Sequence, residues 1–187
     1  YVSTPELLDF VPNAEWLPNP VNLDNLKYSE TNVTGPLKIL HASTNRDVKN
    51  TKAVESSISK LKSDGLDIQF TLLENVQHAE LMEQISKHDL IIDWMNPEFG
   101  IYGVFSIESM ALGRTVICTL TDSLYEGYEL PIINSSPENL EVSIKEVYDN
   151  REILVEKGQL GSEFVNRNHN SEVIAERVLQ KYKSILE

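Results

Sequence analysis

Short apolar runs alternate with amphipathic segments along most of the chain, and each pattern predicts one kind of element. Runs rich in β-branched residues are typical of buried strands, whereas apolar residues three or four positions apart mark one face of a helix. The apolar runs predict strands at residues 37–41, 67–73, 90–94, 114–120 and 131–133. The amphipathic segments predict helices at residues 51–64, 78–88, 104–112, 151–165 and 171–186, and a further one starting at Pro137 with Ser136 as its N-cap.

Strands that alternate with helices in this way predict an α/β fold, a Rossmann-like parallel sheet flanked by helices on both faces. In such sheets ligands bind beyond the carboxyl ends of the strands. The loops that follow the strands are therefore the candidate site, and they comprise residues 41–52, 74–78, 93–104 and 119–128.

Residues 1–34 do not form a self-contained unit in this pattern. Thr4 and Pro5 are placed to begin a short helix, and proline residues bracket a single predicted strand at residues 13–17. We therefore expect two parts. Residues 1–34 would be the end of a preceding domain together with a linker, and residues 35–187 would be the Rossmann-like domain.

Composition narrows the class of protein. With 187 residues, of which 41% are hydrophobic, the chain is long enough for one core of ordinary size. No apolar run approaches the length of a membrane span, and no signal peptide is visible. Cys118 is the only cysteine and lies in an apolar run, so we expect a buried thiol, no disulfide within the chain and a cytoplasmic location.

The net charge of −13 argues against a nucleic-acid-binding protein and against one that coats an anionic membrane. Residues 37–62 are an exception, because six basic and two acidic residues lie there. This local excess of positive charge is compatible with a small phosphorylated ligand. For Lys60 and Lys62, on a predicted helix, we favour ordinary solvated positions.

Glu98–Gly113 is the stretch with the clearest chemical character. It follows a predicted strand, contains Gly100 and Gly103, and continues into an apolar helical pattern that begins at Val104. A glycine loop between a strand and a helix brings an anion to the helix N-terminus, where unpaired N–H groups and the helix dipole favour it. Glu108 follows one turn later, where its carboxylate can accept hydrogen bonds from ribose hydroxyls.

The segment Glu108-Ser-Met-Ala-Leu-Gly113 resembles a motif of the GT-B glycosyltransferases, in particular the retaining family 4. In that family a first glutamate lies eight residues before the second one. The corresponding position here is Gly100, and Glu98 is two residues out of register, so one expected sugar contact is missing. The resemblance covers most of residues 13–187 and implies the C-terminal, donor-binding half of a GT-B fold, with Glu108 on the ribose.

The loop His41–Thr51 resembles the family segment in which an arginine and a lysine hold the donor diphosphate. Lys49 falls on the lysine of a Lys-Gly pair, Asn50 replaces the glycine, and Arg46 takes the place of the arginine. Cations aimed at a diphosphate leaving group lower the barrier for breaking the glycosidic bond, whatever the family. We therefore expect Arg46, Lys49 and Glu108 to be the catalytic residues.

Further ligand contacts are expected along the same rim. By the resemblance, the backbone near Val76 would frame the nucleotide base, and the N–H groups of Gly103 and Val104 would cap a phosphate. His41, at a strand end, is a candidate sugar contact, and Tyr102 is a candidate to stack on the base. A purely structural role stays open for both side chains.

No dinucleotide-binding glycine motif, phosphate-loop lysine, Cys/His metal spacing, Asp-x-Asp or Gly-x-Ser-x-Gly occurs, so no cofactor or metal is expected. The resemblance implies a glycosyltransferase of hexosyltransferase type that moves a sugar, with retention, from a nucleotide-diphosphate sugar to an unknown acceptor. The acceptor would bind an N-terminal domain outside these residues, so we expect the fragment alone to be inactive. Two alternatives stay open, a non-catalytic GT-B binding or scaffolding module and one half of a sugar-nucleotide epimerase. Peripheral membrane contact of the full-length protein also stays open.

Overall fold

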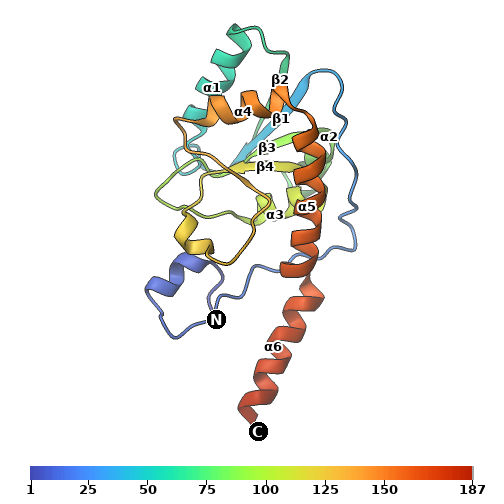
Figure 1. The fold of residues 1–187 in the computed structure, drawn as a ribbon. Coiled ribbons are helices and arrows are strands. Elements are labelled where there is room, and N and C mark those ends of the chain that lie inside the picture. Colours follow the sequence, from blue (N-terminus) through green and yellow to red (C-terminus); the bar gives the residue numbers. More distant parts are fainter. Residues whose placement is uncertain (187) are drawn as a thin grey trace.

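A single parallel sheet organises the chain (Figure 1). The computed structural model describes residues 1–186, and its five strands lie in the order β2-β1-β3-β4-β5 with every neighbouring pair parallel. The strands are β1 (Leu37–Ser43), β2 (Ile68–Glu74), β3 (Leu90–Ile92), β4 (Thr115–Cys118) and β5 (Ile133–Asn134). The Rossmann-like prediction is confirmed.

Helices cover both faces of this sheet. They are α1 (Thr51–Ser63), α2 (His78–Lys87), α3 (Val104–Ala111), α4 (Leu140–Asp149) and α5 (Glu152–Asn168). A sixth helix, α6 (Ser171–Leu186), follows α5. Two short 3-10 helices, η1 (Pro5–Asp9) and η2 (Asp122–Tyr125), lie next to each other, and α6 extends away from the sheet (Figure 1).

The alternation of side chains along each strand divides the core into two clusters. Leu40 and Ile91 point to the face covered by α2, α3 and the end of α5, whereas Ile39 and Ile92 point to the face covered by α1 and α4. The strands β3 and β4 are buried on both faces, as central parallel strands usually are. The helix spacing read from Val54, Ile58 and Leu61 therefore places these three residues against the sheet.

Two element predictions are wrong. Residues 13–17 do not form a strand, because Trp16 makes only a single bridge to Val2 and no second strand lies alongside. The helix expected from Pro137 begins later, at Leu140. The backbone N–H of Asn139 donates to the carbonyl of Ser136, so residues 136–139 form a tight turn that the helix follows.

The leading segment is fixed to the Rossmann-like domain at several points. Val21 forms a bridge with Asn170, between α5 and α6. The buried guanidinium of Arg114 donates hydrogen bonds to the hydroxyl of Thr31 and to the carbonyl of Ser29. The residues before β1 therefore wrap the domain without adding a strand to its sheet.

Candidate functional site

The boundary between β1 and β3 is where the connections of the sheet change direction. From β1 the chain moves to β2 on one side, and β3 then pairs with β1 on the other side. A crevice forms at such a switch point beyond the carboxyl ends of the two strands, and ligands of open α/β sheets bind there. The loops that border it run from Thr44 to Asn50 and from Asp93 to Gly103.

The side chain of Lys49 links the two loops at this boundary. Its Nζ donates hydrogen bonds to Asp93 Oδ1 at 2.7 Å and to the carbonyl of Ala42 at 2.9 Å, and it lies 4.9 Å from the centre of the Phe105 ring. Asp93 is fully buried, and its other oxygen accepts a hydrogen bond of 2.6 Å from Ser106. The Asp93 carboxylate thereby fixes the ammonium group of the β1 loop to the first turn of α3.

The N-terminus of α3 lies beside this lysine. Gly103 is the N-cap, no side chain caps the helix, and the first helical hydrogen bond runs from the N–H of Ile107 to the carbonyl of Gly103. The N–H groups of residues 104–106 therefore precede the hydrogen-bonded ladder, where an anion is favoured. A side chain at Gly103 would place its Cβ 3.0 Å from Nε1 of Trp94, so glycine allows the loop to pack closely.

A cavity of about 170 Å³ lies next to Lys49. Its walls are mainly apolar and include Val76, Leu81 and Phe105. Ser43 also lines it, and the Ser43 Oγ is a buried polar atom without a hydrogen-bond partner among residues 1–186. A hydroxyl buried without a partner costs free energy, so it favours a ligand group that completes its hydrogen bonding. The predicted base-framing residue Val76 thus borders the same cavity as Lys49.

Glu108, in α3, does not line this cavity. It is 8% exposed and borders a larger hollow of about 810 Å³ between residues 20–27, α2 and α3. One carboxylate oxygen, Oε1, accepts a hydrogen bond of 2.7 Å from Nε2 of His78. The structure therefore brings Lys49 and Glu108 to two hollows that share α2 and α3 as walls.

Arg46 does not border either hollow. Its guanidinium is ion-paired with Glu55 and, at 3.0 Å, with Glu74, and its side chain is 43% exposed. A phosphate would compete with both carboxylates for this group. Asn50, which replaces the glycine of the family pair, has a φ of 53°, a left-handed conformation that asparagine tolerates better than most residues.

His41 is a structural residue in this geometry. It has no exposed surface, its Nδ1 donates to the carbonyl of Ile92 at 2.8 Å, and its Nε2 accepts from the hydroxyl of Thr51 at 3.0 Å. Burial lowers the pKa of His41 to about 4, so the imidazole is neutral. Both ring nitrogens are engaged within the protein, which argues against the expected sugar contact from this side chain.

Tyr102 is likewise part of the core. It is 4% exposed, its hydroxyl lies 3.0 Å from Nε2 of His169, and its ring stacks on Tyr125 with a centroid distance of 5.4 Å. Burial raises the pKa of Tyr102 well above its usual range. The ring is buried against another tyrosine, which argues against the expected stacking on a base.

Gly100 has a conformation that excludes a side chain. Its φ is +60°, and an added Cβ would lie 2.0 Å from Oγ1 of Thr121. The Gly100 carbonyl also accepts a hydrogen bond of 2.9 Å from the N–H of Thr121. The first glutamate of the family motif therefore does not fit here without a rearrangement of the loop that follows β4.

Two residues of this site were missed in the sequence. Asp93 pairs with Lys49, and Ser43 presents its unpaired hydroxyl. The available signal was position, because each is a polar residue at the carboxyl end of a buried strand, where ligands of parallel sheets bind.

Within residues 1–186, no helix combines the length and the hydrophobicity needed to cross a membrane. The same residues contain no group of three or more His, Cys, Asp or Glu side chains placed to hold a metal ion.

Comparison with known proteins gives structural relatives only. No protein-family model and no curated protein matches the chain. Sucrose-phosphate synthase from Thermosynechococcus elongatus is similar over 99% of this chain, with a TM-score of 0.73 and 16% identity. An alpha-glucosyltransferase solved with UDP-glucose and DNA is similar over 97%, with a TM-score of 0.65 and 12% identity. A protein from Listeria monocytogenes assigned as a UDP-N-acetylglucosamine 2-epimerase is similar over 88%, with a TM-score of 0.55 and 16% identity.

This likeness shows the fold. The chain spans 57%, 62% and 47% of these three structures, respectively, so it corresponds to roughly half of each. The expected likeness to GT-B glycosyltransferases is confirmed at that level, and the chain folds as half of a GT-B structure.

Proposed function

We propose that these residues form the donor-binding half of a retaining glycosyltransferase and bind a nucleotide-diphosphate sugar. One observation carries the proposal. The ammonium group of Lys49, which is paired with Asp93, and the uncapped first turn of α3 meet at the β1/β3 switch point, where an ammonium donor and free N–H groups favour a diphosphate. The alpha-glucosyltransferase of similar fold was solved with UDP-glucose, which supports a ligand of this class.

In this proposal each group has a separate task. Lys49 and the N–H groups of Gly103 and Val104 bind the diphosphate, Glu108 binds the ribose, and the backbone near Val76 borders the base. As the glycosidic bond breaks, the diphosphate gains negative charge, and fixed positive groups stabilise that change. The other half of a GT-B enzyme would bind the acceptor, so residues 1–187 alone are expected to bind the donor without transferring its sugar.

The acceptor is a separate question. The alpha-glucosyltransferase complex contains DNA, but we do not extend that partner to this chain. The net charge of −13 opposes association with a polyanion, because binding to phosphates depends on neutralising cations.

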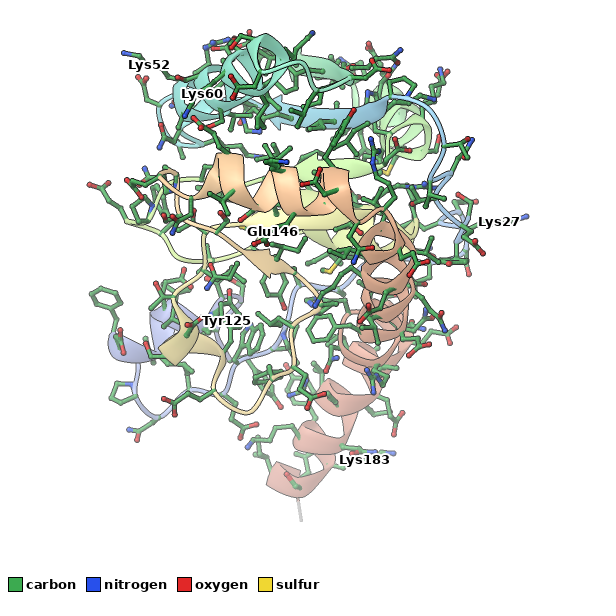
Figure 2. The ribbon with its side chains drawn as sticks, turned by 45° about the horizontal axis from the view of Figure 1, so that its top comes forward. Lys27, Lys52, Lys60, Tyr125, Glu146 and Lys183 are labelled. Carbon is green, nitrogen blue, oxygen red and sulfur yellow. The ribbon has the colours of Figure 1, made fainter. Side chains whose placement is uncertain are left out.

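The binding experiment is thermal unfolding and calorimetry with UDP, GDP and ADP. A diphosphate at about 100 times its dissociation constant adds about 2.7 kcal/mol of stability. We expect one of the three to raise the Tm of the wild-type protein by a few degrees, and Lys49→Met to abolish the increase. Lys52→Met is the matched control. Lys52 lies in the first turn of α1, three residues after Lys49, and its side chain points away from the molecule (Figure 2). The proposal fails if none of the three diphosphates binds the wild-type protein.

A second candidate function is a non-catalytic module that binds nucleotide sugars, and Gly100 favours it. The family position for a sugar-contacting carboxylate is sterically closed by Thr121. Assays of the full-length protein separate the candidates. Binding with neither transfer nor hydrolysis of the sugar supports the module, interconversion of two sugar nucleotides supports an epimerase, and transfer to an acceptor supports the enzyme proposed above.

A further inference from the structure

His78 and Glu108 form a pair in which the two side chains differ sharply in exposure. The His78 side chain is 68% exposed, whereas the Glu108 side chain is 10% exposed. The imidazole Nε2 donates to Glu108 Oε1 at 2.7 Å, and both residues line the hollow bordered by residues 20–27. An exposed histidine at the start of α2 therefore reaches over a nearly buried carboxylate of α3.

The second oxygen of this carboxylate is left for a ligand. No residue of the chain from 1 to 186 donates a hydrogen bond to Glu108 Oε2. The hydrogen bond from Nε2 of His78 to Oε1 restricts rotation of the carboxylate, so the free oxygen favours one direction. A lone carboxylate at this position would rotate, and ordering it on binding would cost part of the affinity.

The position of Glu108 along α3 suits the sugar next to a phosphate. It lies four residues after Val104, the first residue of the helix, which corresponds to about 6 Å along the axis. An anion at the helix N-terminus therefore places an adjoining ribose beside the Glu108 carboxylate. Ribose hydroxyls donate hydrogen bonds, and a carboxylate is their natural acceptor.

We propose that His78 is a positioning residue for ribose recognition, which holds Glu108 so that its free oxygen accepts a hydrogen bond from a ribose hydroxyl. This inference rests on the proposed function, since it assumes a nucleoside diphosphate at α3. It assigns to His78 a role in choosing ribonucleotides over 2′-deoxyribonucleotides. A ligand that lacks the hydroxyl would leave a nearly buried, charged acceptor without its partner, and such losses discriminate strongly.

The test uses whichever of UDP, GDP and ADP binds best. Titration calorimetry measures the dissociation constants of its 2′-deoxy form and its ribose form, and the quantity compared is the ratio of the first to the second. We expect a ratio of about ten or more in the wild-type protein, because a hydrogen bond to a charged group contributes about 1.5 kcal/mol or more. His78→Ala should reduce the ratio to about two or three, and His78→Gln, whose amide also donates, should recover most of it. Ser86→Ala, in the same hollow on α2, should leave the ratio unchanged.

The outcomes separate this inference from the proposed function. If His78→Ala keeps the wild-type ratio, or if the wild-type protein binds both forms equally, the role of His78 is wrong. Binding that still depends on Lys49 would leave the proposed function standing in that case. If none of the three ribonucleotides binds the wild-type protein, the proposed function and this inference both fail. A purely structural role for His78 would lower stability without changing the ratio.

Discussion

Lys49 and Asp93 are joined by a hydrogen bond of 2.7 Å across the switch point of the sheet, and the carboxylate is the fully buried partner. The two residues lie 44 positions apart in the sequence. Lys49 therefore serves the fold and the proposed site together, because the cation that would meet a diphosphate also neutralises a carboxylate in the interior.

The first prediction concerns the stability of this pair. Breaking a buried ion pair by removing one partner leaves an uncompensated charge, at a cost of about 3–5 kcal/mol. We expect Lys49→Met to lower the free energy of unfolding by about 3 kcal/mol, at the lower end of this range because Lys49 is partly exposed. The combined variant Lys49→Met/Asp93→Asn should recover part of the loss. Guanidinium unfolding followed by circular dichroism measures both changes.

An exposed ion pair provides the comparison. Lys60 and Glu141 are paired at the surface between α1 and α4, and water already solvates both groups. Glu141→Gln should change the stability much less than Lys49→Met does. Equal effects of the two substitutions would contradict the idea that Asp93 depends on Lys49.

The second prediction concerns Arg46, which is bound by Glu55 and Glu74. If Arg46 contributes to diphosphate binding, the ligand must displace these carboxylates and overcome their repulsion. Glu74→Gln should then raise the affinity for the nucleotide diphosphate severalfold, and the gain should disappear when Arg46→Ala is added. Calorimetry at low ionic strength measures the effect at its largest, since salt screens exposed charges. A gain in affinity that persists in the absence of Arg46 would mean that the lost negative charge of Glu74 acts on the ligand directly, and not through Arg46.

The third prediction concerns the glycine that replaces the family glutamate. Gly100→Ala combines an unfavourable positive φ with a Cβ 2.0 Å from the Thr121 hydroxyl. Gly127→Ala is the matched control, because Gly127 has a φ of +84° and open space around its missing Cβ. The positive φ lowers the free energy of unfolding by about 1–2 kcal/mol in each alanine variant. Only Gly100→Ala, which also has the close contact, should be destabilised clearly more than that. Equal losses in thermal unfolding would show that the loop after β4 yields easily and that Gly100→Glu is worth testing as a gain of function.

The sequence predicts what local periodicity determines, and it fails where the outcome depends on distant partners. The spacing of Val54, Ile58 and Leu61 identifies the buried face of α1, because a helix repeats every few residues. The strand expected at residues 13–17 has the length of a strand and is bracketed by prolines, but it finds only the single partner Val2, which no local pattern reveals.

The candidate site shows the same limit. The motifs around Glu108 and Lys49 point to loops at the carboxyl ends of the strands, but nothing in them predicts that Arg46 is bound by two carboxylates. His41 lies at the carboxyl end of a strand in sequence and yet faces α1, because side chains alternate along the strand and Thr51 completes its hydrogen bonding. The direction in which each side chain points, and the residues that it contacts, are known only from the tertiary structure.

The last prediction is the pH dependence of stability that His41 introduces. Its pKa is about 4 in the folded protein, and a histidine in an unfolded chain titrates near 6.5. Between these values the unfolded state binds a proton that the folded state does not, so stability is complete above pH 6.5 and falls as the pH decreases. One such group costs about 1.4 kcal/mol per pH unit, or about 3 kcal/mol by pH 4.

His88 and His169 also have pKa values lowered by burial, and they add to the same trend. The contribution of His41 is therefore the difference between the wild-type protein and His41→Gln, compared by guanidinium unfolding from pH 7.5 down to pH 4.5. Glutamine keeps a donor for the Ile92 carbonyl but does not titrate, so the variant should be less stable at neutral pH and should show a shallower decline. Parallel curves for the two proteins would mean that His41 takes up its proton in the folded state, which would contradict its burial between β1 and α1.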